Sequence, residues 1–236
     1  MTLPLLAEGA VLRTAARLAS AMVRYHGATL DGAHHLPAGP ALLVGNHGLL
    51  GLDTPVLFSL LHTATGRFPF GLADRFLFSS WPVRSILASI GGVPGTRENA
   101  LLLLRRGEHV VCYPGGSREV FKAPDARYQL AWERAVGFAH VAIEAGVPVL
   151  PFAGLGVDDT CVNLGHAQLL RGLGRYAPPL AFGPFPVRLR FRLGEPLVPP
   201  RSLSQAQAFK ELVQKRVEAL LEDRAEAASQ PAPVVP

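Results

Sequence analysis

The alternation of apolar and polar positions along the chain predicts helices that alternate with buried strands. Short apolar runs predict strands at residues 40–46, 68–73, 89–95, 108–114, 147–157 and 187–197. Helical spacing of apolar positions predicts helices at residues 10–25, 53–64, 96–107, 128–146 and 202–224. Helices between mostly apolar strands indicate an α/β fold, a single domain with a mostly parallel central sheet flanked by helices.

One predicted strand, unlike the others, alternates apolar and charged residues. Residues 187–197 place Arg188, Arg190 and Arg192 on alternate positions. Side chains of a strand point alternately to its two faces, so this pattern predicts one solvated face. We therefore expect an edge strand here.

The predicted helix at residues 10–25 is amphipathic. Its arginines and apolar residues lie on opposite sides at helical spacing, with Arg13, Arg17, Ser20 and Arg24 facing away from Val11, Leu12, Leu18, Met22 and Val23. Two interpretations fit this pattern. The helix packs as a surface element on its own domain, or it lies in a bilayer interface with its arginines toward phosphates.

Three segments are expected along the chain. Residues 1–27 form the amphipathic, membrane-associating helix, residues 28–228 the main domain, and residues 229–236 a disordered tail. No cleavable signal peptide is expected, because Pro4 and Glu8 interrupt a segment that lacks a basic start. Residues 32–52 contain no Asp, Glu, Lys or Arg, yet their histidines, prolines and glycines argue against a membrane-spanning helix.

Composition narrows the possible partners. Hydrophobic residues make up 49% of the chain and charged residues 17%, with a formal net charge of +5. This balance suits a peripheral protein at an anionic membrane surface, and we expect it on the cytoplasmic face. No nucleic-acid partner is expected, since dense basic clusters with interleaved aromatics are missing. The two cysteines set no disulfide framework, which fits a reducing compartment.

Polar residues gather where predicted strands end. His47 follows the strand at residues 40–46, and Asp53 begins the next helix after a Gly- and Leu-rich turn. A carboxylate that holds Nδ1–H of an imidazole leaves the other ring nitrogen as a base. No serine or cysteine stands beside the pair, so the nucleophile would be a hydroxyl of the substrate. The alternative is that His47 makes its hydrogen bonds within its own loop and has no catalytic role, with Asp53 only capping a helix.

Two further turns carry cationic and glycine residues. Arg97 lies beside a predicted helix start, and Ser117 and Arg118 follow the flexible pair Gly115–Gly116. Glycines let main-chain N–H groups approach an anion closely, and an arginine side chain can donate two parallel hydrogen bonds to one phosphate. Together with a base, these turns supply the groups that acyl transfer needs.

Four motifs occur in the order and rough spacing of the glycerolipid (lysophosphatidate-type) acyltransferase superfamily: "GNH…D", "VPGTREN", "YPGGSRE" and "GVPVLPF". The chain resembles most closely the diacylglycerol acyltransferase-like branch, which includes the phytyl-ester synthases. In that branch "NHxLLGL", "YPGGxRE" and an aromatic-rich helix recur, similar to "YQLAWERAVGF" here. The resemblance covers about residues 30–200.

The resemblance implies transfer of a fatty acyl group from acyl-CoA or acyl-carrier protein to the hydroxyl of a lipid. It implies His47 as general base and Asp53 as the residue that orients it, without a metal or a prosthetic group. The residues it implies for substrate binding are Asn46, Arg97, Gly115, Gly116, Ser117, Arg118 and Glu119. It also implies that the strand "VPVLPF" helps to line an acyl tunnel.

The chain departs from the superfamily pattern at two places. His47 and Asp53 are separated by five residues instead of four, so their pairing requires a longer turn. Gly115 stands where phospholipid-type members carry a glutamate, although Glu119 is near. Both departures match the neutral-lipid branch and predict diacylglycerol or a long-chain alcohol as acceptor.

Other functions remain open from the sequence. A lysophosphatidate or lysophospholipid acyltransferase is the first alternative. A thioester hydrolase and a non-catalytic lipid-binding protein are the others, although "GGSRE" is not the G-x-S-x-G turn of serine hydrolases. Asp158 and Asp159 are expected in a solvated turn and not as metal ligands.

Overall fold

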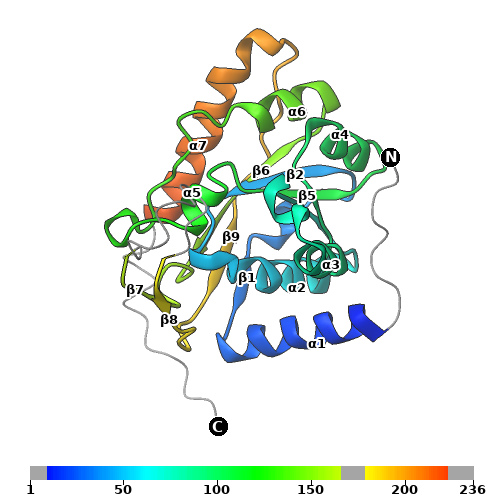
Figure 1. The fold of residues 1–236 in the computed structure, drawn as a ribbon. Helices are drawn as coiled ribbons and strands as arrows, with labels where there is room; N and C mark the ends of the chain where they lie inside the picture. The colour runs from blue at the N-terminus through cyan, green and yellow to red at the C-terminus, as the bar shows by residue number, and fades with distance from the viewer. Residues whose placement is uncertain (1–9, 166–178, 223–236) are drawn as a thin grey trace.

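The computed structural model describes residues 10–165 and 179–222, which form an α/β domain around a twisted sheet (Figure 1). Its helices are α1 (Ala10–Tyr25), α2 (Asp53–Thr65), α3 (Trp81–Ser89), α4 (Arg97–Arg105), α5 (Ser117–Val120), α6 (Gly137–Ala145) and α7 (Ala206–Glu222). Its strands are β1 (Thr29–Asp31), β2 (Ala41–Gly45), β3 (Phe70–Ala73), β4 (Gly92–Pro94), β5 (His109–Cys112), β6 (Val149–Leu155), β7 (Val162–Asn163), β8 (Ala181–Phe182) and β9 (Arg190–Leu193). Short 3-10 turns include η2 (Leu49–Gly51) and η3 (Arg75–Ser79).

Within the described residues, seven strands form the main sheet in the order β1-β9-β6-β2-β5-β3-β4. The strands from β6 to β4 pair in parallel, and β9 runs antiparallel to β6. This confirms the predicted mostly parallel sheet. The carboxyl ends of β2, β5 and β3 therefore meet at one edge, where ligand sites of such sheets are found.

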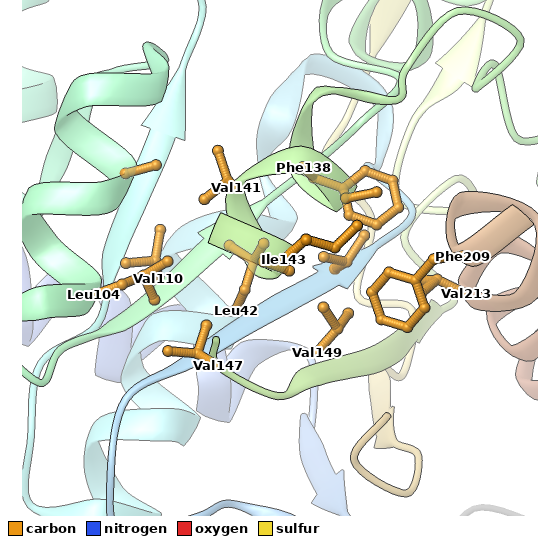
Figure 2. Close-up of a cluster of buried hydrophobic side chains, with 14 of the residues drawn as sticks. Leu42, Leu104, Val110, Phe138, Val141, Ile143, Val147, Val149, Phe209 and Val213 are labelled. Atoms are coloured by element: carbon orange, nitrogen blue, oxygen red, sulfur yellow. The ribbon is translucent and has the colours of Figure 1, made fainter. Parts of the chain in front are cut away.

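Alternate residues of the central strand divide the core into two layers. Leu42 and Val44 face a cluster formed with α4, α6 and α7, which Figure 2 shows in part. Ala41 and Leu43 face the other cluster, formed with α2. A strand covered on both faces needs apolar residues at every position, which explains the unbroken run in β2.

The prediction that residues 187–197 form an edge strand is wrong. β9 lies between β1 and β6, and β1 forms the edge instead. Arg190 and Arg192 are nevertheless accommodated because Asp31 of β1 forms ion pairs with both. The alternating arginines therefore mark a charged face paired with a neighbouring strand.

The predicted helix at residues 128–146 is also too long. Only Gly137–Ala145 form α6, and residues 128–136 cross the carboxyl edge of the sheet as a loop. The other predicted helices are present, with Thr96 capping α4 by accepting a hydrogen bond from the Asn99 N–H.

The amphipathic helix α1 packs on its own domain, as the first interpretation proposes. Met22 and Val23 pack against the core cluster of α2, while Arg17, Leu18 and Arg24 are exposed. A contribution of α1 to membrane association remains a prediction. Residues 1–9 and the expected tail at residues 229–236 lie outside the described residues. Across the described ranges, none of the helices combines the length and the apolar composition that crossing a bilayer requires.

The packing of α7 on the sheet yields a stability prediction. Val213 is fully buried and lies near Val149 and Phe209, whereas its neighbour Leu212 is 43% exposed (Figure 2). We expect Val213→Ala to lower the free energy of unfolding by about 2 kcal/mol, because truncation leaves a cavity. Leu212→Ala is the matched control and should change it by less than about 1 kcal/mol. Urea unfolding measures both, and equal losses would contradict this account of the core.

Candidate active site

His47 and Asp53 meet at the carboxyl edge of the sheet. Nδ1 of His47 lies 3.0 Å and 3.2 Å from the two carboxylate oxygens of Asp53. A carboxylate only accepts hydrogen bonds, so Nδ1 carries the proton and donates it. In the neutral imidazole Nε2 is then the unprotonated ring nitrogen, and among the described residues it has no hydrogen-bond partner. The structure thus brings together the predicted pair, and the role of Nε2 as a base stays a prediction.

The turn between the two residues takes an unusual path. Leu50 and Gly51 both adopt left-handed backbone conformations, with φ of 58° and 71°. For a leucine this conformation is uncommon and strained. The two residues turn the chain within η2 so that Asp53 returns to His47, which is how the longer spacing is accommodated. A Cβ at position 51 would lie 3.7 Å from Nε2 of His47, so the glycine keeps the space beside Nε2 open.

Tyr113 covers one side of the imidazole. Its ring stacks on His47 with centroids 3.8 Å apart and an angle of 9° between the planes. Burial, followed by the nearby charge of Asp53, raises the pKa of the Tyr113 phenol well above its usual value. The ring is therefore a neutral surface that fixes the plane of His47. Tyr113 was not predicted as a site residue, although it directly follows β5, the strand that pairs with β2 before His47.

The main chain of His47 is held from both sides. Its N–H donates to Oε2 of Glu119 at 2.7 Å, and its carbonyl accepts from Nζ of Lys122 at 3.0 Å. Lys122 also forms a buried ion pair with Asp158 at 2.9 Å. The expected solvated turn at Asp158 is thus wrong, since this carboxylate is buried. Glu119 and Lys122 fix the position from which the imidazole extends.

Glu119 was expected to bind substrate, and its surroundings correct that role. It is buried, and Oε1 accepts hydrogen bonds from the Ala131 N–H at 3.0 Å and from the Trp132 indole at 2.8 Å. Burial raises the pKa of Glu119, while the hydrogen bond from the His47 N–H opposes that shift. Both oxygens are engaged with the protein, so Glu119 positions the His47 loop instead of meeting a ligand.

The side chain of Asn46 and the space beside the Cα of Gly115 are likewise taken up by contacts within the protein. The amide of Asn46 donates to the Gly154 carbonyl at 3.1 Å and accepts from the Gly154 N–H at 2.7 Å. A Cβ at position 115 would collide with the carboxyl group of Glu119. Asn46 therefore ties the end of β2 to β6, and Gly115 makes room for Glu119. The side chain of Asn46 is thus occupied within the protein, and a contact of the Gly115 main chain with substrate stays a prediction.

A cavity of about 230 Å³ opens beside His47. Its walls come from α2, β3, α3 and α5, with the apolar residues Leu50, Pro55, Phe58, Leu72, Leu77, Leu87, Ile90, Val120 and Phe121. Gly116 and Ser117 also line it, and their role in substrate binding stays a prediction. The strand "VPVLPF" was expected to help line an acyl tunnel. Strand β6 is buried and contributes no residue to the wall of this cavity, so that role stays a prediction.

A second, larger cavity of about 840 Å³ shares Asp74, Tyr113 and Gly116 with the first. Arg75, Arg97 and His140 make its wall more basic. Arg97 is at the same time ion-paired with Glu144. Arg118, in contrast, is exposed, pairs with Glu133 at 3.1 Å and lines neither cavity. Of the two arginines predicted to form an anion cradle, only Arg97 lies at a cavity.

Cys112 also reaches the wall of the larger cavity. Removal from solvent raises the pKa of its thiol to about 12. It is therefore a neutral thiol near pH 7 and a poor nucleophile.

Comparison with known proteins gives consistent matches. The model of the acyltransferase family matches residues 27–154. A protein of Homo sapiens named "DGAT1/2-independent enzyme synthesizing storage lipids" is 32% identical over 202 residues, or 84% of this chain and 62% of that protein. Phytyl ester synthase 2, chloroplastic, of Arabidopsis thaliana is 34% identical over 130 residues, or 52% of this chain and 18% of that protein. The chain thus spans about 62% of the human relative and much less of the plant one.

The fold has a counterpart among solved structures. The 1-acyl-sn-glycerophosphate (LPA) acyltransferase PlsC from Thermotoga maritima superposes with a TM-score of 0.61 at 18% sequence identity. The match covers 94% of this chain and 81% of that one. At this identity the likeness establishes a shared fold.

The buried ion pair beneath His47 yields a prediction. Lys122→Met leaves the Asp158 carboxylate buried without its cation, which should lower the free energy of unfolding by about 3–5 kcal/mol. The double variant Lys122→Met/Asp158→Asn removes the unpaired charge and should recover part of that loss. Urea unfolding of the wild type, Lys122→Met, Asp158→Asn and the double variant measures the cycle.

Lys215→Met provides the matched control, because Lys215 is exposed on α7. We expect this variant to unfold within about 0.5 kcal/mol of the wild type. If Lys122→Met were no more destabilising than Lys215→Met, the ion pair would not support the site.

Proposed function

This chain belongs to the acyltransferase family, and on that premise we propose that it moves a fatty acyl group from a thioester to the hydroxyl of a lipid. The observation that carries the proposal is the hydrogen bond from His47 Nδ1 to Asp53, which leaves Nε2 beside an apolar cavity. A base in apolar surroundings suits a reaction between two lipid-like substrates.

The chemistry follows from these two residues. Nε2 of His47 takes the proton of the acceptor hydroxyl as its oxygen attacks the thioester carbonyl. The carbon–sulfur bond of the tetrahedral intermediate then breaks, and the imidazolium gives its proton to the departing thiolate. Asp53 holds the imidazole in one tautomer and stabilises its positive charge. No covalent acyl-enzyme is required, so the reaction needs no side-chain nucleophile.

We propose acyl-CoA or acyl-carrier protein as the donor, without a metal or other cofactor. The larger cavity supports this choice, because Arg75 and Arg97 in its wall can contact the phosphates that both donors carry. Tyr113 and Gly116 line both this cavity and the His47 cavity, which supports a donor held close to the base. Membrane lipid would supply the acceptor, with the protein peripheral on the cytoplasmic face.

A neutral acceptor, diacylglycerol or a long-chain alcohol, is the preferred substrate in this proposal. The cavity beside His47 is apolar, and Glu119 is buried where it cannot anchor a polar head. The names of the relatives, a storage-lipid enzyme and a phytyl ester synthase, favour the same class. Phosphorylated acceptors remain the second candidate, because Arg97 could bind an acceptor phosphate as well as a donor phosphate.

The decisive experiment offers labelled acyl-CoA to the full chain together with equal amounts of diacylglycerol and lysophosphatidate. We expect triacylglycerol to exceed phosphatidate, because the wall around His47 lacks a fixed cation. Separation of the labelled lipids by thin-layer chromatography measures both products. The wild-type protein serves best, since Gly115→Glu would collide with Glu119.

The other outcomes distinguish the alternatives. An excess of phosphatidate would make the neutral acceptor wrong and leave the role of His47 intact. Release of free fatty acid without ester would indicate a thioester hydrolase. No turnover with any lipid alcohol, in a protein that still binds lipid, would indicate a non-catalytic lipid-binding protein.

A further inference from the structure

The segment from η3 to α3 exposes large apolar side chains. Trp81 is 71% exposed, Ile86 63% and Phe76 51%, with Val83 also at the surface. These residues fall within eleven consecutive positions, 76–86. Scattered apolar residues are ordinary on a protein surface, but a concentration that includes an exposed tryptophan marks a site of interaction.

The charged residues of this segment are all basic. Arg75 and Arg84 are exposed within it, and residues 75–90 contain no Asp or Glu. Arginines beside exposed apolar residues complement a surface that is anionic outside and apolar beneath. A bilayer with anionic lipids has that arrangement, and tryptophan favours its interface.

The same segment forms a wall of the His47 cavity. Leu77 of η3 and Leu87 of α3 line that cavity, together with Ile90 just after the helix. The segment thus presents one set of apolar residues to solvent and another to the cavity. Figure 1 shows α3 away from the layer formed by α6 and α7.

We infer that residues 75–90 dock on the surface of a lipid bilayer and set the His47 cavity against it. Trp81 and Ile86 enter the interface, and Arg84 contacts lipid phosphates. Helix α1 is less suited to be the sole anchor, because Met22 and Val23 already pack on the domain. The inference rests on the proposed function in one respect: a lipid acceptor would then reach His47 from the membrane.

Trp81 provides the probe for this surface. The chain contains two tryptophans, and Trp132 is fully buried. With phosphatidylcholine vesicles that contain phosphatidylglycerol, we expect the emission of Trp81 to move to shorter wavelength and brominated lipid to quench it. Trp81→Phe should remove both changes and retain vesicle binding, which assigns the signal to this residue.

Vesicle flotation then tests the contribution of the segment. Trp81→Ser/Ile86→Ser should weaken binding by about tenfold or more, because it removes the apolar contact. The matched control is Val198→Ser/Leu212→Ser, which alters two exposed apolar residues elsewhere and should bind as the wild type. Arg84→Glu should weaken binding only when phosphatidylglycerol is present, whereas Arg216→Glu on α7 should not.

Three results would overturn the inference. The first is unchanged Trp81 emission while the protein floats with vesicles. The second is a Trp81→Ser/Ile86→Ser protein that binds vesicles as the wild type does. The third is a wild-type dimer in sedimentation velocity that the double variant abolishes, with no binding of vesicles by either protein. His47→Ala should bind vesicles normally, so failure of docking and failure of acyl transfer are separate outcomes.

Discussion

The hydrogen bond from the His47 N–H to Glu119 is the contact on which the site depends. It joins the loop after β2 to the segment after β5, two parts of the chain that are 72 residues apart. Glu119 in turn holds Ala131 and Trp132, and thereby draws residues 128–136 over the edge of the sheet. Three donors on one buried carboxylate offset its loss of solvation, which makes the arrangement specific.

The imidazole is thus fixed by independent means. Its main chain is held by Glu119 and Lys122, its plane by Tyr113 and its tautomer by Asp53. Strain at Leu50 is the cost of bringing Asp53 back to His47, and the buried contacts around the loop can sustain it. A base that must act on a lipid hydroxyl benefits from this preorganisation, since little motion is left to restrict during reaction.

Sequence patterns predicted much of this arrangement, for identifiable reasons. His47 and Asp53 stand at a strand end and a helix start, positions that local periodicity and the family resemblance both mark. The roles of Glu119, Lys122 and Tyr113 depend on which loops meet in space, and no local pattern contains that information. The resemblance to a family motif even suggested substrate binding for Glu119, because a motif records position and not the direction of a side chain.

The two wrong element predictions have a similar origin. Trp132 and its apolar neighbours show helical spacing, yet they serve to cover and bind Glu119 in a loop. The arginines of β9 alternate as on a solvated strand, yet Asp31 of the adjacent strand pairs with them. In both cases a partner distant in sequence satisfies a polar group, and this overrides the local pattern.

The central claim is that His47 acts as a general base held by Asp53. Its most direct test is the turnover of acyl-CoA into lipid ester by His47→Ala, in protein shown by urea unfolding to retain wild-type stability. The account predicts a loss of about 10²–10⁴-fold, the usual contribution of a general base. A folded His47→Ala protein that retains most of the wild-type turnover would contradict it.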